Sequence, residues 1–266
     1  MCFRRLFALY DLQSKPSGQE SKVSINALTY SKLYVVETIS CYPEPVKGIW
    51  NQDEVFSVRS WGEIAEVLSR YADKTDRSSL FLGFFSEAYR GLSGKNPVLV
   101  GGGAVEVYTH GGYVTGDLDL ICDAAIARKI LTGWDFSSAE FSRSFYRPEM
   151  DLYVELLGVQ DVNGDPEATS RVEAMLVGGT MLFSIISLED LIIDRLLAFV
   201  HWGHRESALW AQAMMKGALG PETLLDTGYI RRKLSEQEDA EKLCVAFESL
   251  LKEVLAISER EEEGDA

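Results

Sequence analysis

The sequence predicts an α+β fold in which a small mixed β-sheet with flanking helices is followed by an α-helical C-terminal part. Two observations lead to this prediction. Between residues 61 and 186, runs with helical periodicity alternate with short β-like runs, and Gly178-Gly179 between the last two of them is a hairpin signal. From Ser187 onward, the apolar residues recur at helical spacing.

Each expected helix combines an apolar face at helical spacing with suitable residues at its ends. Asp123 can cap the helix that runs to Leu131, and Gly94 can end the helix over Leu80–Leu92. Ser187 and Ser235 are each followed three residues later by an acid, which is the pattern of a capping box. The expected helices are Trp61–Ala72, Leu80–Leu92, Ala104–Tyr108, Asp123–Leu131, one that begins at Ser187, Glu206–Ala218, Pro221–Lys233 and Gln237–Ile257.

The expected strands are short apolar or alternating runs bounded by turn residues. They are Pro97–Val100, Asp117–Ile121, Leu152–Leu157, Val172–Val177 and Thr180–Ile185. The first 60 residues carry only isolated β-like runs such as Lys32–Ile39. We therefore expect an N-terminal extension of uncertain structure over 1–60, an α/β domain over 61–186, and a helical C-terminal domain with an acidic tail over 187–266.

The composition indicates an ordinary globular protein of 266 residues, of which 46% are hydrophobic and 25% charged. The net charge of −15 disfavours non-specific binding to nucleic acid, although it is compatible with a local basic groove. The four cysteines are scattered without metal-like spacing, which favours reduced thiols and a cytoplasmic location. We expect no membrane partner, because the chain shows neither a signal-peptide pattern nor an uncharged apolar run of about 18 residues.

Three glycines, Gly101-Gly102-Gly103, follow the expected strand that ends at Val100. Glycine allows a sharp turn and a close approach of the backbone to a ligand. A helix that begins at Ala104 would direct free backbone N–H groups toward that ligand, which suits a phosphate. The pattern is neither a dinucleotide fingerprint nor a Walker loop, and by itself it also fits a tight turn between strand and helix.

Asp117-Leu118-Asp119-Leu120 lies in the next expected strand. Because alternate residues of a strand point to the same face, the two aspartates lie side by side and the two leucines face the core. Two such carboxylates repel each other, and a divalent cation such as Mg²⁺ would bind them together with substrate phosphates. The other interpretation is an amphipathic strand with its polar face toward water.

Together, the two motifs resemble the signature of the nucleotidyltransferase superfamily that includes DNA polymerase β. Val100-Gly101-Gly102 matches its hydrophobic residue with two glycines, and Asp117-Leu118-Asp119 matches its acid-hydrophobic-acid motif. The fuller pattern resembles the small stand-alone nucleotidyltransferases of prokaryotic toxin–antitoxin and abortive-infection systems and their uncharacterised relatives, as does SLEDLIIDRLL from Ser187. The resemblance spans about residues 80 to 230 and implies a nucleotidyltransferase-like sheet.

Members of this superfamily complete the metal site with a third carboxylate on a later strand. Here Asp151 and Glu155 both fall on one face of MDLYVELLG by period-2 counting. We prefer Glu155, because a carboxylate in the middle of an apolar run needs a reason; Asp151 is the substitute, and a cross-strand ion pair is the other interpretation of Glu155. The resemblance thus implies that Asp117, Asp119 and Glu155 are catalytic and hold two Mg²⁺ ions.

The resemblance also implies that Gly101, Gly102 and Thr115 bind the nucleotide. Relatives often carry an arginine two residues before the threonine, whereas this chain has Tyr113 there. Arg195 is the candidate replacement for that phosphate contact. Its other interpretation is a surface salt bridge to a nearby acid.

Two further patterns carry weaker signals. We interpret the pair His201 and His204 as part of a helix end, with metal binding as the alternative. We interpret the triplet Arg231-Arg232-Lys233 as solvated surface, with contact to an acidic substrate as the alternative.

The resemblance implies an enzyme: a Mg²⁺-dependent nucleotidyltransferase that moves a nucleoside monophosphate from a nucleoside triphosphate (NTP) to a hydroxyl acceptor. The acceptor is open, and an RNA end such as that of a tRNA, a protein or a small molecule would all suit the donor site. The alternative is a non-catalytic binding or regulatory module with the same fold, as part of a toxin–antitoxin pair. In that case the helical C-terminal part is the candidate surface for a protein partner.

Overall fold

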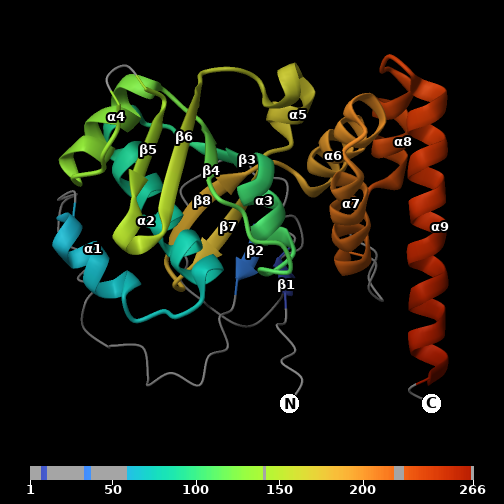
Figure 1. Cartoon of the computed structure of the whole chain (residues 1–266), viewed down its shortest axis with the longest axis horizontal. Helices are drawn as coiled ribbons and strands as arrows, with labels where there is room; N and C mark the ends of the chain where they lie inside the picture. Colours follow the sequence, from blue (N-terminus) through green and yellow to red (C-terminus); the bar gives the residue numbers. More distant parts are fainter. Residues whose placement is uncertain (1–6, 11–32, 37–58, 140–141, 219–224, 265–266) are drawn as a thin grey trace, which may run out of the picture. The chain divides into compact units, whose positions relative to one another are not determined.

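A computed structural model describes residues 7–10, 33–36, 59–139, 142–218 and 225–264 (Figure 1). Most of the predicted N-terminal extension over 1–60 lies outside these residues. The chain divides into two compact units, and neither is continuous in sequence. The first unit comprises Met1–Leu99, Asp119–Gln160 and Arg171–Ile185, and the second comprises Val100–Leu118, Asp161–Ser170 and Ile186–Ala266.

The first unit is built on a mixed sheet, which has eight strands among the described residues, in the order β1-β2-β7-β8-β3-β4-β6-β5. Six of them, β3 to β8, come from the part of the chain beyond residue 59. β3 runs parallel to β8, whereas β7–β8 and β5–β6 are antiparallel pairs. The predicted mixed sheet is therefore confirmed. The strands are β1 (Phe7–Tyr10), β2 (Leu33–Val36), β3 (Val98–Val100), β4 (Leu118–Ile121), β5 (Ser144–Arg147), β6 (Leu152–Gly158), β7 (Glu173–Val177) and β8 (Met181–Ile185).

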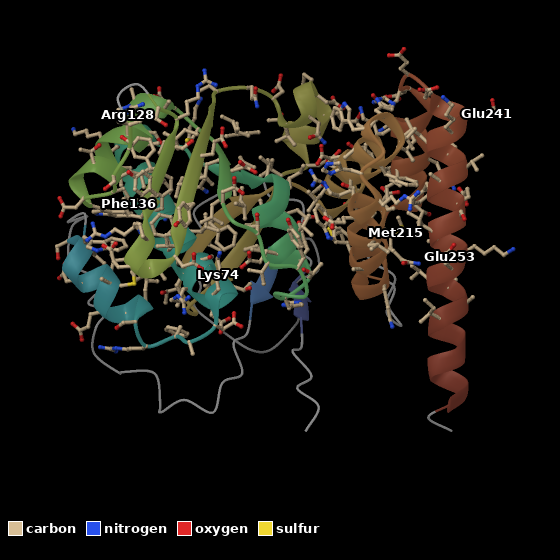
Figure 2. All side chains as sticks on the ribbon, viewed as in Figure 1. Lys74, Arg128, Phe136, Met215, Glu241 and Glu253 are labelled. Atoms are coloured by element: carbon tan, nitrogen blue, oxygen red, sulfur yellow. The ribbon has the colours of Figure 1, made fainter. Side chains whose placement is uncertain are left out.

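Three helices of the first unit lie with this sheet: α1 (Trp61–Leu68), α2 (Lys74–Ser93) and α4 (Ala124–Gly133). α2 packs against β7 and β8, and α4 packs against β6 (Figure 1). Their aromatic side chains meet in the core, where Phe81 contacts Trp134 and Phe136 at centroid distances of 6.2 and 5.5 Å; Phe136 is labelled in Figure 2. This packing supports the strands that carry the candidate site.

The second unit is mainly helical, which confirms the prediction of a helical C-terminal part. Its helices are α3 (Gly101–Tyr108), α5 (Pro166–Ser170), α6 (Leu188–Trp202), α7 (Arg205–Ala218), α8 (Thr227–Ser235) and α9 (Ala240–Gly264). α6 packs against α3, α7, α8 and α9. Of its apolar residues at helical spacing, Leu191, Ile192 and Leu196 are fully buried, whereas Phe199 is half-buried. Gln212 on α7 donates a hydrogen bond to Glu253 on α9, which is labelled in Figure 2. None of the helices in the described part of the chain combines the length and apolar content of a membrane-spanning segment.

One helix start in the first unit differs from the prediction. α2 begins at Lys74 rather than Leu80, because the carboxylate of Asp73 accepts a hydrogen bond from the backbone N of Asp76. Ser78 and Ser79, which directly precede the expected start, are buried inside the helix. The capping residue therefore lies about two turns before the start that the apolar pattern predicts.

The capping box predicted at Ser235 and Glu238 is wrong. Ser235 is the last residue of α8, and its hydroxyl donates a hydrogen bond to the carbonyl of Arg232 at 2.6 Å. α9 begins only at Ala240 and continues to Gly264, beyond the predicted end at Ile257 and into the acidic tail. α8 begins at Thr227, whereas the predicted start at Pro221 lies outside the described residues.

The predicted β7–β8 hairpin is confirmed, with one difference in its turn. Gly178 and Gly179 have φ values of 60° and 75°, a left-handed backbone that glycine adopts without strain. Val177 pairs with Met181, so the connection has three residues instead of two. A short edge strand, β5, was not predicted, because its four residues (SFYR) give too brief an alternation to stand out.

Candidate metal centre

Strand β4 positions two aspartates. Asp119 lies within the strand and Asp117 lies directly before it. Leu118 and Leu120 are only 4% and 1% exposed, so they fix the strand to the core. The aspartates therefore share the opposite side, where Asp119 is half-buried and Asp117 is exposed. This is the alternation that the sequence predicts.

Strand β6, the neighbour of β4 in the sheet, carries the third carboxylate. Val154 and Leu156 are buried, whereas Glu155 between them is half-buried on the other side. Asp151, the substitute candidate, lies before the strand in a left-handed conformation with φ 53°. Its carboxylate pairs with the Nζ of Lys74 at 3.1 Å; Lys74 is labelled at the start of α2 in Figure 2. The structure thus brings Glu155, and not Asp151, to the aspartates.

Asp117, Asp119 and Glu155, termed the acidic triad below, each place one carboxylate oxygen within 4.8 Å of the other two. The aspartates are held together locally, because a single residue separates them in the chain. Two unit charges at this distance repel by about 3–4 kcal/mol at an effective dielectric constant near 20. Such a group therefore has a strong electrostatic reason to bind a cation. Among the described residues, the triad is the one group of three metal-ligating side chains this close together.

The chemistry of the triad fits a hard divalent cation. All of its donor atoms are carboxylate oxygens, which Mg²⁺, Mn²⁺ and Ca²⁺ prefer, whereas Zn²⁺ sites usually include histidine or cysteine. Oxygens bound to one Mg²⁺ lie about 3.0 Å apart at neighbouring positions and about 4.2 Å apart at opposite positions. The triad oxygens, which lie within 4.8 Å of one another, would therefore have to approach each other to bind one ion together.

The three glycines Gly101-Gly102-Gly103, termed the glycine turn below, form the first turn of α3. The helix begins at Gly101 rather than at the predicted Ala104, and Gly101 has a φ of 64°, which disfavours any other residue. The residue before it, Val100, provides no side-chain cap. The N–H groups at the start of a helix lack partners within the helix. Here those groups belong to the glycines themselves, so no Cβ atom shields them from an anion.

Thr115 connects the glycine turn to Asp117, the member of the acidic triad that belongs to the second unit. Its hydroxyl donates a hydrogen bond to the Oδ1 of Asp117 at 3.2 Å. A Cβ atom added to Gly102 would lie only 2.7 Å from the same hydroxyl oxygen. The close approach of Thr115 therefore requires glycine at position 102, and it places the turn beside Asp117.

Arg195 makes the salt bridge that the sequence analysis gave as its other interpretation. Its Nε donates to Asp194 at 3.0 Å, and 16% of its side chain is exposed. The guanidinium also lies over the ring of Trp210, 5.8 Å from its centroid. Trp210 in turn contacts Tyr113, with 4.2 Å between the ring centroids, and Tyr113 lies 3.7 Å from a Cβ built on Gly102. Two aromatic rings thus connect Arg195 with the glycine turn.

The histidine pair and the basic triplet both contribute to the helical structure. His201 and His204 are exposed on either side of Gly203, which ends α6 with a φ of 68°, so the predicted helix end is confirmed. In the basic triplet, Arg231 pairs with Glu248 at 2.6 Å. The other two basic residues belong to a group termed the ion-pair cluster below, which consists of Arg232, Lys233, Asp165, Glu167 and Glu236.

The cysteines in the described part of the chain, Cys122 and Cys244, are free thiols. Cys122 follows β4 closely, yet it is buried, and this burial raises the pKa of its thiol to about 12. A thiol that stays protonated at neutral pH is a poor nucleophile and a poor metal ligand. The chemistry near β4 therefore depends on carboxylates.

Sequence reasoning missed Glu106, a carboxylate on α3 that is 1% exposed and accepts a hydrogen bond from the backbone N of Thr115 at 2.8 Å. The signal was present. Glu106 lies inside the apolar run AVEVY, and an acid in that position needs a reason, as Glu155 does.

A scan of the chain against known protein families finds no match, and a search of functionally characterised proteins finds none either. The geometry of the acidic triad and the glycine turn therefore carries the functional argument.

Proposed function

We propose that this chain is a Mg²⁺-dependent nucleotidyltransferase that moves a nucleoside monophosphate from an NTP to a hydroxyl acceptor. The observation that carries the proposal is that Thr115 contacts both the glycine turn and a carboxylate of the acidic triad. Its side chain packs on Gly102 at the start of α3, and its hydroxyl binds Asp117 of the acidic triad. A donor site for a phosphate chain thus adjoins a donor set for a divalent cation.

Each residue has a role in the proposal. Asp117 and Asp119 would hold the cation that binds the triphosphate, and Glu155 would complete the site for a second one. When bound, Mg²⁺ supplies positive charge that lowers the pKa of an attacking hydroxyl and stabilises the oxygens around the α-phosphorus. The backbone N–H groups of Gly101 and Gly102 hold the β- and γ-phosphates. Neither glycine has a side chain that would separate these phosphates from the backbone.

The transfer itself is an in-line displacement. The acceptor oxygen forms a bond to the α-phosphorus, the bond from that phosphorus to the pyrophosphate oxygen breaks, and pyrophosphate leaves. The proton of the acceptor hydroxyl passes to Glu155 as general base. Arg195 is the cationic residue of the second unit that stands beside the Trp210–Tyr113 pair, and we assign it a contact with the triphosphate. This contact requires that the guanidinium exchange its pairing with Asp194 for phosphate oxygens.

The first experiment measures nucleotide binding and its dependence on metal. The whole chain is titrated with ATP, GTP, CTP and UTP in a calorimeter, with Mg²⁺ and again with EDTA. We expect at least one NTP to bind with Mg²⁺ and not with EDTA. Incubation with α-³²P-labelled NTPs and cell extract then shows which fraction, RNA, protein or small molecule, gains the label.

The outcomes separate the enzyme from the alternative. Metal-dependent binding with transfer of label supports the enzyme. Metal-dependent binding without transfer to any fraction supports the nucleotide site and contradicts transfer to the acceptors of the extract. The absence of NTP binding under both conditions contradicts the proposal and favours the non-catalytic binding or regulatory module, because only the enzyme needs metal-dependent affinity for nucleotides.

A further inference from the structure

Glu106 is a buried carboxylate to which the proposed chemistry gives no role. It lies on α3 between Val105 and Val107, both of them buried, and only 1% of its surface is exposed. Its Oε2 accepts a hydrogen bond from the backbone N of Thr115 at 2.8 Å, across the loop that separates α3 from β4. A hydrogen bond to a carboxylate is stronger than one between neutral groups. Glu106 therefore fixes the backbone of Thr115 two residues before Asp117.

Thr115 in turn contacts Asp117 with its side chain. The hydroxyl donates to the Oδ1 of Asp117 at 3.2 Å, and the backbone N of Asp117 donates to the same hydroxyl oxygen at 3.5 Å. Thr115 is 6% exposed, so its rotamer is set by packing and not by solvent. One side chain thus bonds both to the backbone and to the carboxylate of a single member of the acidic triad.

Gly102, on α3, also restricts the position of the Thr115 side chain. A Cβ at position 102 would meet the hydroxyl oxygen of Thr115 at 2.7 Å and its Cβ at 3.3 Å. The Thr115 side chain is therefore enclosed between α3 and Asp117. All of these contacts lie within the second unit.

We propose that Glu106 is a positioning residue of the candidate metal centre: it fixes Thr115, and the Thr115 hydroxyl sets the orientation of the Asp117 carboxylate. The purpose of this arrangement, presenting Asp117 to a divalent cation, rests on the proposed function. The orientation itself does not. Residues that orient a metal ligand typically change metal affinity by roughly 10–100-fold when they are removed.

Three variants separate positioning from general stability. Thr115→Val removes the hydroxyl and keeps the shape of the side chain. Glu106→Ala removes the acceptor of the Thr115 N–H, whereas Glu106→Gln retains an acceptor oxygen and serves as the rescue. Thermal unfolding identifies any variant that fails to fold. Thr115→Val keeps the shape of the side chain and, with the hydroxyl, loses the long 3.5 Å hydrogen bond from the backbone N of Asp117, so it keeps the test valid if Glu106→Ala does fail.

The first measurement uses NMR on the metal-free chain, where the Hα–Hβ couplings of Asp117 report its χ1 rotamer. We expect one rotamer in the wild type and in Glu106→Gln, and averaged couplings in Thr115→Val and Glu106→Ala. Unchanged couplings in Thr115→Val, or in a folded Glu106→Ala, overturn the inference. The second measurement is the affinity for Mn²⁺ alone, which we expect to be weaker by about 10-fold in Thr115→Val and close to wild type in Glu106→Gln.

The two measurements also distinguish the failure of this inference from the failure of the proposed function. A wild-type chain that binds no Mn²⁺ contradicts the proposed function, and the couplings of Asp117 still decide the positioning role. A wild-type chain that binds Mn²⁺ with the same affinity as a folded Thr115→Val variant contradicts the positioning role and leaves the metal centre in place.

Discussion

The acidic triad and the ion-pair cluster each bring three carboxylates together, but their surroundings differ. In the cluster, Lys233 lies on Asp165 and near Glu167 and Glu236, and Arg232 pairs with two of these acids. In the triad, the carboxylates lie within 4.8 Å of one another, and Asp117 receives its hydrogen bond from a neutral hydroxyl. The acids of the ion-pair cluster hold helices together, whereas the acids of the triad are suited to bind a cation from solution. The triad should therefore govern binding, and the cluster should govern stability.

The largest effect is expected from Asp119→Asn. The amide keeps the size of the side chain but removes one charge from the triad, so we expect Mn²⁺ affinity and nucleotide transfer to fall by roughly 100-fold or more. The free energy of unfolding should change much less than the binding, because the amide keeps the shape of the side chain. Calorimetric titration and urea unfolding measure the two quantities.

Asp151→Asn is the matched control for that variant. Asp151 is an exposed acid before β6 that pairs with Lys74 outside the triad. Its Mn²⁺ affinity should stay close to that of the wild type. Equal losses in Asp119→Asn and Asp151→Asn would show that the binding depends on overall charge and not on the triad.

The next largest effect is expected from Gly102→Ala. The new Cβ would lie 2.7 Å from the Thr115 hydroxyl oxygen, so Thr115 must shift and the Asp117 carboxylate loses its donor. We expect Mn²⁺ affinity to weaken by about 10-fold. Gly133→Ala, also in a helix but with no atom within 4 Å of the new Cβ, is the control and should bind as the wild type does. Wild-type affinity in Gly102→Ala would contradict the role of this contact.

Lys233→Ala should have the opposite effect to the triad variants: it should lower the free energy of unfolding and leave the Mn²⁺ affinity unchanged. Lys233 is 8% exposed, and its removal leaves Asp165 without its main cationic partner. We expect the free energy of unfolding to fall by about 1–2 kcal/mol in urea titrations. Lys242→Ala, at an exposed pair with Asp239, should lower the free energy of unfolding much less than Lys233→Ala does. A change in Mn²⁺ affinity in Lys233→Ala would mean that the two groups are coupled.

The smallest expected effect is on the stability of the fold at acid pH. The hydrogen bond from Lys233 lowers the pKa of Asp165 from its ordinary value of 3.8, and that from Arg232 lowers the pKa of Glu167 from 4.5. A carboxyl group whose pKa is lower in the folded state stabilises the fold above its unfolded pKa, and this contribution is lost as the pH falls through the folded pKa.

Urea unfolding between about pH 5 and pH 3 should therefore show falling stability in the wild type. The decrease should be smaller in Lys233→Ala, because Asp165 no longer has the partner that lowers its pKa. Identical pH profiles for the two proteins would indicate that Asp165 does not contribute to acid sensitivity.

Much of the candidate site could be predicted from the sequence, because its signals are local. The alternation around Asp117 and Asp119 sets which side chains face the core, and the same argument selected Glu155 from the middle of an apolar strand. The start of α9 could not be predicted in this way. Its first residue, Ala240, is preceded by Asp239 with a φ of 59°, a conformation that no sequence pattern announced.

The sequence by itself determined the periodicities of this protein: which face of each strand and helix is apolar, and where the glycines permit the chain to turn. Only the tertiary structure decided which distant groups meet. It joined Glu155 to the aspartates while Asp151 went to Lys74, and it placed the basic residues of α8 on the acids of the ion-pair cluster. Side-chain period is a property of a few neighbouring residues, whereas the pairing of strands and the packing of helices depend on contacts between segments far apart in the chain.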